Sequence, residues 1–529
     1  MVTNIIGLGR KDYIFSNWAG IFSCKPSLYF QPSTLDEIVG LVKGAREANT
    51  TIMVVGSGHS PSDLTMTNEW LVNLDKFNKV LDLQKDKSGL FTDVTVEAGL
   101  RIYQLNEYLA DNGLALQNLG SISEQSVAGI ISTGTHGASP YHGLVSQQFV
   151  NLTIVNGKGE IVYLDSETNQ DVFRAALLGL GKIGVIVKAT IRAIPAFNIK
   201  SSQEVINFDT LLEKWDTLWV SSEFIRVWWF PYAKKCILWR GQKTEEPLSA
   251  PRESWYGTKL GRLFYESLLW IAVHIYSPLT PYVEKFIFNR QYGTVETLGN
   301  GAIAVQPSVE GLNMDCLFSQ FVDEWAAPLN NGPEILRSLE HYINTAAVNH
   351  DFYVHVPVEV RCSNTTTTNA IGNVADVTNR TEISPGPIKG NDLRPLLDNT
   401  PTLNYAPLSD VTNSQLTLYI NATMYRPFFT NSPIGKWFKI FEETMGAAGG
   451  KPHWAKNFLG SVEWAAGDVK EEKAYKDGEM RGFAKKNQEW FGENLKNFKR
   501  IRKEQDPYNV FLSSKEWAIR NGIVGVDEL

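Results

Sequence analysis

The chain has 529 residues, of which 43% are hydrophobic and 20% charged, and its net charge is −7 at pH 7. Its 15 Trp, 19 Tyr and 26 Phe supply more apolar surface than a disordered or fibrous protein contains. The acidic balance and the lack of a long basic run argue against a nucleic-acid-binding protein. The length predicts about three domains, or two large ones, and small-molecule chemistry becomes the leading expectation.

The four cysteines are far apart in the sequence and form no C-x-x-C pair. We therefore expect neither a disulfide scaffold nor a metal site built on cysteine. The N-terminal residues have neither the apolar core of a signal peptide nor the Arg- and Ser-rich composition of a transit peptide. We expect the N-terminus to be retained.

Strand and helix signals alternate through the first 195 residues. Thr34, three residues before Glu37, forms a capping box that predicts a helix start. The strand-like residues 52–55 lead into residues 56–62, GSGHSPS, a loop too rich in glycine and serine for a helix or strand. The alternation predicts an α/β domain over residues 1–195, whose later elements are a strand at 94–96, a helix at 101–112 ended by Gly113, and a hairpin at Asn156-Gly157.

Residues 179–184, GLGKIG, match the G-x-G-x-x-G pattern of nicotinamide-binding Rossmann domains. That fingerprint requires a strand before the glycines and a helix after them. Here a helix-like segment, 172–178, precedes the pattern and a β-branched strand, 183–191, follows it. The reversed context argues against a Rossmann domain.

The composition becomes strongly aromatic from about residue 197 to 440. Strand-like runs at 224–230 and 416–420 indicate a second domain built on a sheet. Residues 363–399 are polar and include four consecutive threonines, which is typical of a long surface insertion. We place the second domain at 196–445 and a C-terminal segment, with a helix near 490–502, at 446–529.

Residues 268–276, LLWIAVHIY, form the longest apolar run. A helix that crosses a bilayer needs about 20 apolar residues, so this segment is too short to span a membrane. Two interpretations stay open, a buried helix and an amphipathic helix that rests on a membrane surface. The short length favours the buried helix.

Two glycine- and hydroxyl-rich loops lie in the first domain, at 56–62 and at 129–137. Such loops expose backbone N–H groups that can bind phosphate oxygens, although tight turns with capping hydroxyls would give the same pattern. His59 stands among small residues, where an imidazole could reach a bound cofactor. A single histidine is more often structural or solvated.

The glycine-rich loops and the motifs near them are more specific together than any one of them is alone. The GSGHS loop, the later G-x₅-THG loop and Lys182-Ile-Gly-Val-Ile together resemble the FAD-binding domain of the vanillyl-alcohol oxidase flavoprotein class. Residues 54–62, residues 118–125 (NLGSISEQ) and residues 451–456 (KPHWAK) narrow the resemblance to fungal sugar-1,4-lactone oxidases along essentially the whole chain.

This resemblance implies an α+β, two-domain fold, in which an FAD-binding α/β domain is joined to a sheet-based cap that forms the substrate cavity. It matches His59 to the residue that bonds covalently to the flavin. The positions expected to line the cofactor are Gly56, Ser57, Gly58, His59, Ser60, Pro61, Ser121, Ser126, Gly129, Thr133, Gly134, Thr135, His136, Gly184 and Ile186. A structural hydrogen bond is an equally good interpretation of His136.

Glu359 and Arg361 lie two residues apart in the strand-like VPVEVR segment, so their side chains share one face of the strand. The pattern alone favours a structural ion pair, whereas the resemblance matches the two to catalytic residues. It adds Lys456 as a third candidate. It also matches Gly120 to a position beside the reactive flavin carbon, where the missing Cβ would leave space for oxygen.

The implied activity is oxidation of D-arabinono-1,4-lactone and related aldono-1,4-lactones by O₂, which gives hydrogen peroxide and an enediol lactone, D-erythro-ascorbate. A dehydrogenase with another electron acceptor is the enzymatic alternative, and a catalytically inactive binding module is the alternative from another class. The resemblance further implies a mitochondrial membrane location, which we expect to be peripheral. The preferred lactone and the oligomeric state are not encoded in these motifs.

Overall fold

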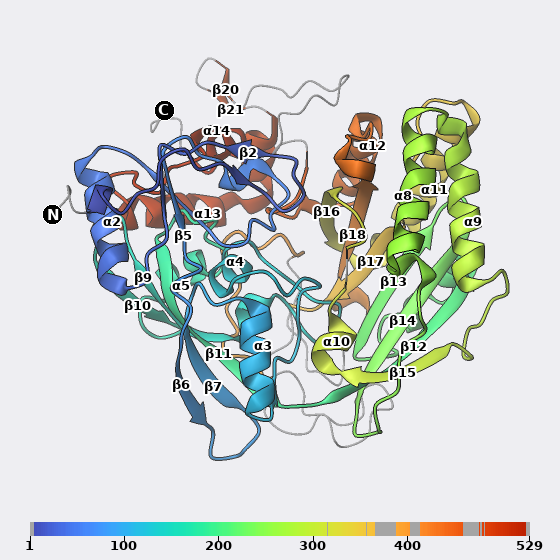
Figure 1. Ribbon diagram of the computed structural model, residues 1–529, viewed down its shortest axis with the longest axis horizontal. Coiled ribbons are helices and arrows are strands. Elements are labelled where there is room, and N and C mark those ends of the chain that lie inside the picture. Colours follow the sequence, from blue (N-terminus) through green and yellow to red (C-terminus); the bar gives the residue numbers. More distant parts are fainter. Residues whose placement is uncertain are drawn as a thin grey trace.

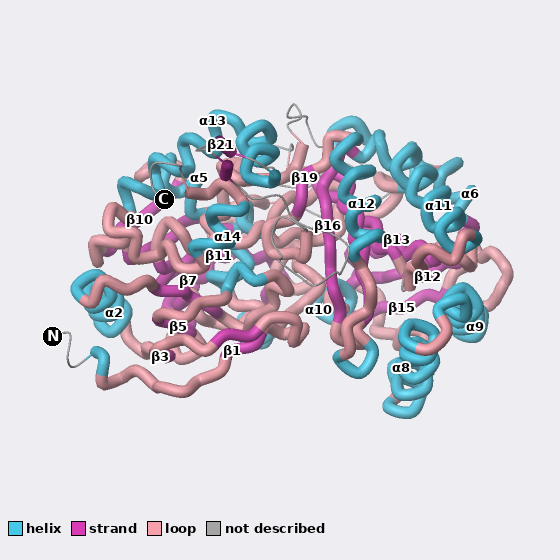
Figure 2. Tube along the Cα trace, turned by 90° about the horizontal axis from the view of Figure 1, so that it is seen from above, coloured by secondary structure: helices cyan, strands magenta, loops and turns pink. Residues whose placement is uncertain are grey.

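The computed structural model describes residues 5–314, 316–355, 357–365, 388–401, 413–458, 475–476, 479–480 and 482–524. Two lobes lie side by side, each built on its own sheets, and the C-terminal helices return to the first lobe (Figure 1; Figure 2). Most of the polar insertion expected at 363–399 lies outside the described residues, at 366–387.

The first lobe opens with a small parallel sheet in the order β3 (Leu28–Phe30), β5 (Trp70–Asn73) and β4 (Ile52–Val55). The crossover helix α2 (Leu35–Glu47) joins β3 to β4, and the predicted capping box of Thr34 and Glu37 opens it. The apolar side of α2 packs on this sheet through Ile38, Leu41 and Val42. The loop of residues 56–62 therefore begins at the carboxyl end of a buried parallel strand.

A second, antiparallel sheet completes this lobe. Gly113 follows α3 (Ile102–Asp111) and has a φ of 67°, a conformation that glycine adopts without steric cost. As expected, a helix precedes residues 179–184 and a strand follows them. The sheet order is β10 (Ile161–Asp165), β9 (Phe149–Val155), β11 (Val185–Pro195), β7 (Thr92–Glu97) and β6 (Val80–Lys85), with β8 (Leu114–Ala115) on β11, and the helices are α3 (Ile102–Asp111), α4 (Val127–Ser132) and α5 (Gln170–Ala176).

The second lobe is an eight-stranded sheet in which each neighbouring pair is antiparallel. The order is β15 (Ala302–Pro307), β12 (Asn198–Asn207), β14 (Lys235–Thr244), β13 (Phe224–Phe230), β17 (Val358–Ser363), β18 (Thr417–Tyr425), β16 (Gln320–Pro328) and β19 (Lys451–Pro452).

One face of this sheet packs under helices, and the other faces the first lobe. In β17, Val358, Val360 and Cys362 belong to the helix-covered core, so the alternate residues Glu359 and Arg361 lie on the opposite face. The helices of this lobe are α6 (Phe208–Glu213), α7 (Trp215–Leu218), α8 (Lys259–His274), α9 (Thr280–Tyr292), α10 (Ser308–Leu312), α11 (Gly332–Val348) and α12 (Gly435–Ala447).

The apolar segment at 268–276 lies mostly in α8, which stands beside α9 at the outer side of the second lobe (Figure 1). Tyr265, Leu269 and Ala272 face the protein, whereas Leu263 is 53% exposed and Ile275 66% exposed. The favoured interpretation as a buried helix is therefore correct for only one face, because the opposite face is apolar and exposed. No helix among the described residues is both long enough and apolar enough to span a bilayer.

The C-terminal helices α13 (Gly482–Gln505) and α14 (Lys515–Arg520) pack on the first lobe (Figure 1). After α13, the Asp506 carboxylate accepts hydrogen bonds from the N–H groups of Val510 and Phe511 at 2.9 and 2.8 Å. The Val510 carbonyl then accepts from Ile52 N–H at 2.7 Å. This segment therefore fixes β4, the strand that carries the glycine-rich loop.

Candidate cofactor cavity and active site

A cavity opens beside the loop that follows β4. Backbone and small side chains form much of its wall, together with apolar residues such as Leu64 and Leu74. Of the residues expected to line the cofactor, those in this wall are Gly56, Ser57, Gly58, His59, Ser60, Ser126, Gly129, Thr133, Gly184 and Ile186.

The glycines of this wall are required by close approach. A Cβ on Gly56 would lie 2.5 Å from Ser126 Oγ, and Gly58 has a φ of 70°. Ser126 Oγ accepts a hydrogen bond from Gly129 N–H at 3.2 Å at the start of α4. A narrow cavity of glycines, hydroxyls and aliphatic side chains fits a flavin dinucleotide, whose phosphates need small polar neighbours and whose ring needs apolar ones.

His59 lines this cavity and also the neighbouring one described below. Its ring stacks on Trp18 with centroids 5.4 Å apart. Burial, helped by the positive charges of Arg101 and Lys456, lowers the pKa of His59 to about 4. The imidazole is therefore neutral at neutral pH and carries a nitrogen lone pair, as a nucleophile requires.

A second cavity adjoins the first, because His59, Ser60, Gln125 and Thr133 line both. Its wall combines loops of the first lobe with the open face of the second sheet. The three catalytic candidates line it, namely Glu359, Arg361 and Lys456, and so does Gly120. Ser121, Thr135 and His136, expected to contact the cofactor, line this second cavity instead of the first.

Pro61 and Gly134 are not among the described residues that line either cavity. The Pro61 carbonyl accepts hydrogen bonds from Asn17 Nδ2 at 2.8 Å and from Asn457 Nδ2 at 2.9 Å, so it connects the glycine-rich loop to the C-terminal HWAK segment. Gly134 has a φ of 74°, and its Cβ would lie 2.9 Å from Leu178. Both residues lie in the loops that line the cavities, and they stabilise these loops without facing either cavity.

Glu359 and Arg361 form a buried pair on β17, with Arg361 Nε 3.5 Å from Glu359 Oε2. Arg361 Nη1 also donates to Ser121 Oγ at 3.5 Å, which links the sheet to the first lobe. Glu359 Oε1 is buried and has no hydrogen-bond partner among the described residues. A buried acceptor without a partner is costly, so this oxygen is available to a ligand in the cavity.

Two charged residues were not identified from the sequence: Glu324, which lines the second cavity, and Arg226, which lies beside Arg361 in the sheet. Glu324 on β16 pairs with Arg361 Nη2 and, at 3.4 Å, with Lys456 Nζ. Burial alone would raise the pKa of Glu324, but Arg361 and Lys456 hold it well below its ordinary value. Arg226 lies opposite Arg361 in the β13–β17 ladder, and burial lowers its pKa to about 10 although Glu359 opposes the shift.

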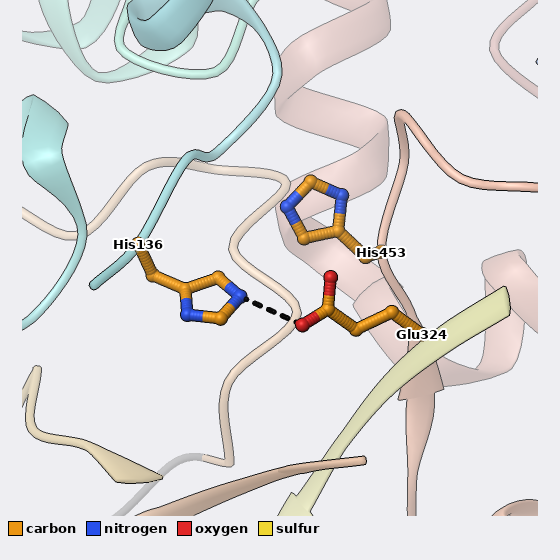
Figure 3. A group of neighbouring side chains, drawn as sticks. All are labelled: His136, Glu324 and His453. Carbon is orange, nitrogen blue, oxygen red and sulfur yellow. Dashed lines mark ion pairs between the residues drawn. The ribbon is translucent and has the colours of Figure 1, made fainter. Parts of the chain in front are cut away.

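His136 and His453 both lie beside the Glu324 carboxylate (Figure 3). His136 stacks on Tyr419 with centroids 3.5 Å apart, and its Nε2 lies 3.3 Å from Glu324 Oε1. His453 lines the second cavity, and burial lowers its pKa to about 3. Trp454 is buried and donates from Nε1 to the Leu397 carbonyl at 2.8 Å, so it anchors the HWAK segment.

Gly120 lines the second cavity and lies against the side chain of Thr135. A Cβ there would lie 2.7 Å from the Thr135 methyl carbon and 3.4 Å from Gln125 Oε1. The Thr135 methyl is the end of a side chain and not backbone, so it could yield by a small shift. The loop therefore tolerates alanine only with a local adjustment.

Comparison with known proteins gives two family matches. The D-arabinono-1,4-lactone oxidase model matches residues 189–521, and an FAD binding domain model matches residues 26–165. A D-arabinono-1,4-lactone oxidase of Kluyveromyces lactis is 67% identical over 98% of this chain and 99% of its own length. That of Saccharomyces cerevisiae is 63% identical over 98% of both chains.

Solved structures of cholesterol oxidases share the fold. The solvent-stable cholesterol oxidase superposes with a TM-score of 0.71 at 17% identity over 96% of this chain and 97% of its own. The enzyme of Brevibacterium sterolicum gives a TM-score of 0.68 at 16% identity over the same shares. The fold is thus that of a two-domain flavoprotein of the vanillyl-alcohol oxidase type, and the chain belongs to the D-arabinono-1,4-lactone oxidase family.

Proposed function

We propose that this protein is an FAD-dependent oxidase that converts D-arabinono-1,4-lactone and related aldono-1,4-lactones, with O₂, to an enediol lactone (D-erythro-ascorbate) and hydrogen peroxide. The observation that carries the proposal is the cavity shared by the two lobes. It adjoins the cofactor cavity through His59 and presents Glu359, Arg361 and Lys456 to a small polar ligand.

Oxidation of a lactone alcohol removes a hydride from carbon and a proton from oxygen. FAD, when bound, accepts the hydride. Glu359 Oε1, which is buried and has no partner among the described residues, accepts a hydrogen bond from a lactone hydroxyl and can take its proton. Arg361 stabilises the negative charge that develops on the lactone oxygen as the proton leaves. Such electrostatic stabilisation is strong in a buried site.

Oxygen consumption with a panel of aldono-1,4-lactones tests the proposal. We expect lactone-dependent oxygen uptake that is matched by the peroxide produced. Anaerobic mixing that leaves the flavin oxidised with every lactone would contradict the function. Flavin reduction without oxygen uptake would support a dehydrogenase instead.

We further propose that His59 holds FAD covalently, because its neutral imidazole lies at the junction of the two cavities. His59→Ala should release the flavin when the protein is precipitated with acid, while the wild-type precipitate keeps its yellow colour. His142→Ala is the control, since His142 is also buried but contacts Glu223 in the second lobe. Flavin that stays attached to the denatured His59→Ala chain would refute the linkage.

Glu359→Gln and Arg361→Ala should each slow flavin reduction by about 10²-fold or more while FAD is retained. The reason is that both side chains face the second cavity and not the wall of the first. Stopped-flow reduction by lactone is the measurement. Glu204→Gln is the matched control, because it removes a buried carboxylate that pairs with Arg240 at 2.6 Å in the same sheet. Reduction near the wild-type rate in both site variants would leave the pair a structural role.

We propose that Gly120 leaves the space through which oxygen reaches the flavin. Gly120→Ala alone would push on the Thr135 methyl, so the double variant Gly120→Ala/Thr135→Ser separates filled space from strain. Compared with Thr135→Ser, the double variant should keep its rate of reduction by lactone and lose about tenfold or more in reoxidation by O₂. Equal reoxidation rates in the two variants would reject the oxygen path.

We also propose that the protein associates peripherally with an anionic membrane through α8 and α9. Leu260 and Tyr282 on these helices are 76% and 69% exposed, and Lys259, Lys285 and Arg290 on the same helices are exposed too. Exposed apolar side chains beside cations fit a surface of anionic lipid. The mitochondrial membrane implied by the family resemblance is the location we propose, and cell fractionation tests it.

Leu260→Asp/Leu263→Asp should weaken binding to vesicles of phosphatidylcholine and phosphatidylglycerol by at least about tenfold, because two apolar contacts are lost. Sedimentation with the vesicles measures the binding. Ile161→Asp in the first lobe is the control, since Ile161 is 55% exposed and Leu263 is 53% exposed. Unchanged vesicle binding of the α8 variant would contradict the proposed membrane-binding surface. So would a wild-type oligomer that is lost only in the α8 variant, because the exposed face would then be a contact between protein copies.

A further inference from the structure

Glu324 is the residue on which the charged groups of the second cavity converge, and its position follows from strand alternation. In β16, Phe321, Trp325 and Ala327 belong to the helix-covered core, so Glu324 points to the other face, into the cavity. Its neighbour Asp323 points to the core side, where it accepts from Trp325 Nε1 at 3.1 Å. Only 1% of the Glu324 surface is exposed.

Three groups from three separate segments contact this one carboxylate. Arg361 Nη2 of β17 donates to Oε1, and Lys456 Nζ from the HWAK segment lies 3.4 Å from Oε2. His136 Nε2, from the first lobe, lies 3.3 Å from Oε1 (Figure 3). Glu324 thus connects the sheet of the second lobe, the C-terminal segment and the first lobe.

His136 lies between a backbone carbonyl and the Glu324 carboxylate. Its Nδ1 lies 3.0 Å from the Gly137 carbonyl oxygen, and its Nε2 lies 3.3 Å from Glu324 Oε1. Burial lowers the pKa of His136, so the imidazole is neutral and has one N–H to donate. With the hydrogen on Nε2, the imidazole donates to the Glu324 carboxylate.

The donor atoms of His136, Glu324 and His453 lie within 4.8 Å of one another, a spacing that could suit a metal ion. Charge argues against this use. Arg361 and Lys456 already pair with the Glu324 carboxylate, and a divalent cation between the imidazoles would meet both positive groups at short range. The Glu324 carboxylate is therefore better suited to hold the Arg361 and Lys456 side chains than to bind an additional metal cation.

Resting on the function proposed above, we propose that Glu324 is a positioning residue of the lactone cavity. It holds Arg361 and Lys456 at the angle and distance at which they face the lactone, and it contacts His136 of the first lobe. Because Glu324 helps to orient the guanidinium, only Oε2 of Glu359 pairs with Arg361, and Glu359 Oε1 is left for the substrate.

Glu324→Gln tests this role, since the amide keeps the size and removes the charge. We expect FAD to be retained and the limiting rate of flavin reduction to fall by about 10²-fold, with the lactone dissociation constant changed by less than about fivefold. The flavin midpoint potential should rise, because loss of a negative charge beside two cations favours the reduced, more negative flavin. A slower rate with an unchanged or lower potential would indicate local unfolding and overturn the proposal.

Asp323→Asn is the positional control, because it replaces a buried carboxyl on the adjacent residue of β16 that faces the opposite side. Burial and Glu442 raise the pKa of Asp323 well above its ordinary value, so this change alters a buried polar group and removes no charge. It should leave flavin reduction near the wild-type rate, and a loss equal to that of Glu324→Gln would overturn the proposal. Glu324→Asp, which keeps the charge, should recover part of the rate.

Coupling to Arg361 supplies the final test. If Glu324 acts partly through Arg361, then Glu324→Gln should lower the reduction rate less in an Arg361→Ala background than in the wild type. Full additivity of the two losses would contradict the positioning role. Wild-type flavin that no lactone reduces would refute the proposed function itself, and the shift of the midpoint potential would still report on Glu324.

Discussion

The arrangement of the candidate active site depends on one interaction, the pairing of the buried Arg361 guanidinium with two carboxylates. Glu359 lies on its own strand and Glu324 on β16, while Ser121 approaches from the first lobe. Removing one member of such a buried set leaves an uncompensated charge, which commonly costs about 3–5 kcal/mol. Because the charges are buried, they stay oriented without a ligand, and this preorganisation is what electrostatic catalysis requires.

The fold brings these groups together from distant parts of the chain. β19, at Lys451–Pro452, adds to the edge of the cap sheet beside β16, so the HWAK segment that follows ends next to Glu324. The chain then returns through α13 to the first lobe, where Asp506 and Val510 fix β4. The glycine-rich loop and Lys456 are therefore both positioned by the C-terminal part of the chain.

Local signals in the sequence were sufficient for much of this arrangement. The Thr34–Glu37 capping box, the loop after β4 and the shared face of Glu359 and Arg361 are all encoded within a few residues, and the structure has them as expected. The D-arabinono-1,4-lactone oxidase family was also recognisable from short motifs, and the family comparisons confirm it.

Contacts between residues that are far apart in the sequence could not be predicted from such local signals. Glu324 stands in QFVDEWAAP, where two acidic residues interrupt an apolar strand, and that interruption was the available signal. Which of the two faces the cavity depends on the register of β16 with β18. Similarly, α8 has apolar residues on both faces, so periodicity alone did not show that Leu269 is buried while Leu263 is exposed.

The central claim is that an aldonolactone binds between the lobes, against the charged face of the cap sheet. A crystal structure of the FAD-loaded protein with a bound lactone tests it most directly. The account predicts the lactone in the second cavity, with a hydroxyl within hydrogen-bond distance, about 3.2 Å or less, of Glu359 Oε1, and with Arg361 still paired to Glu324. A lactone bound elsewhere, or bound without contact to Glu359 and Arg361, would contradict the account.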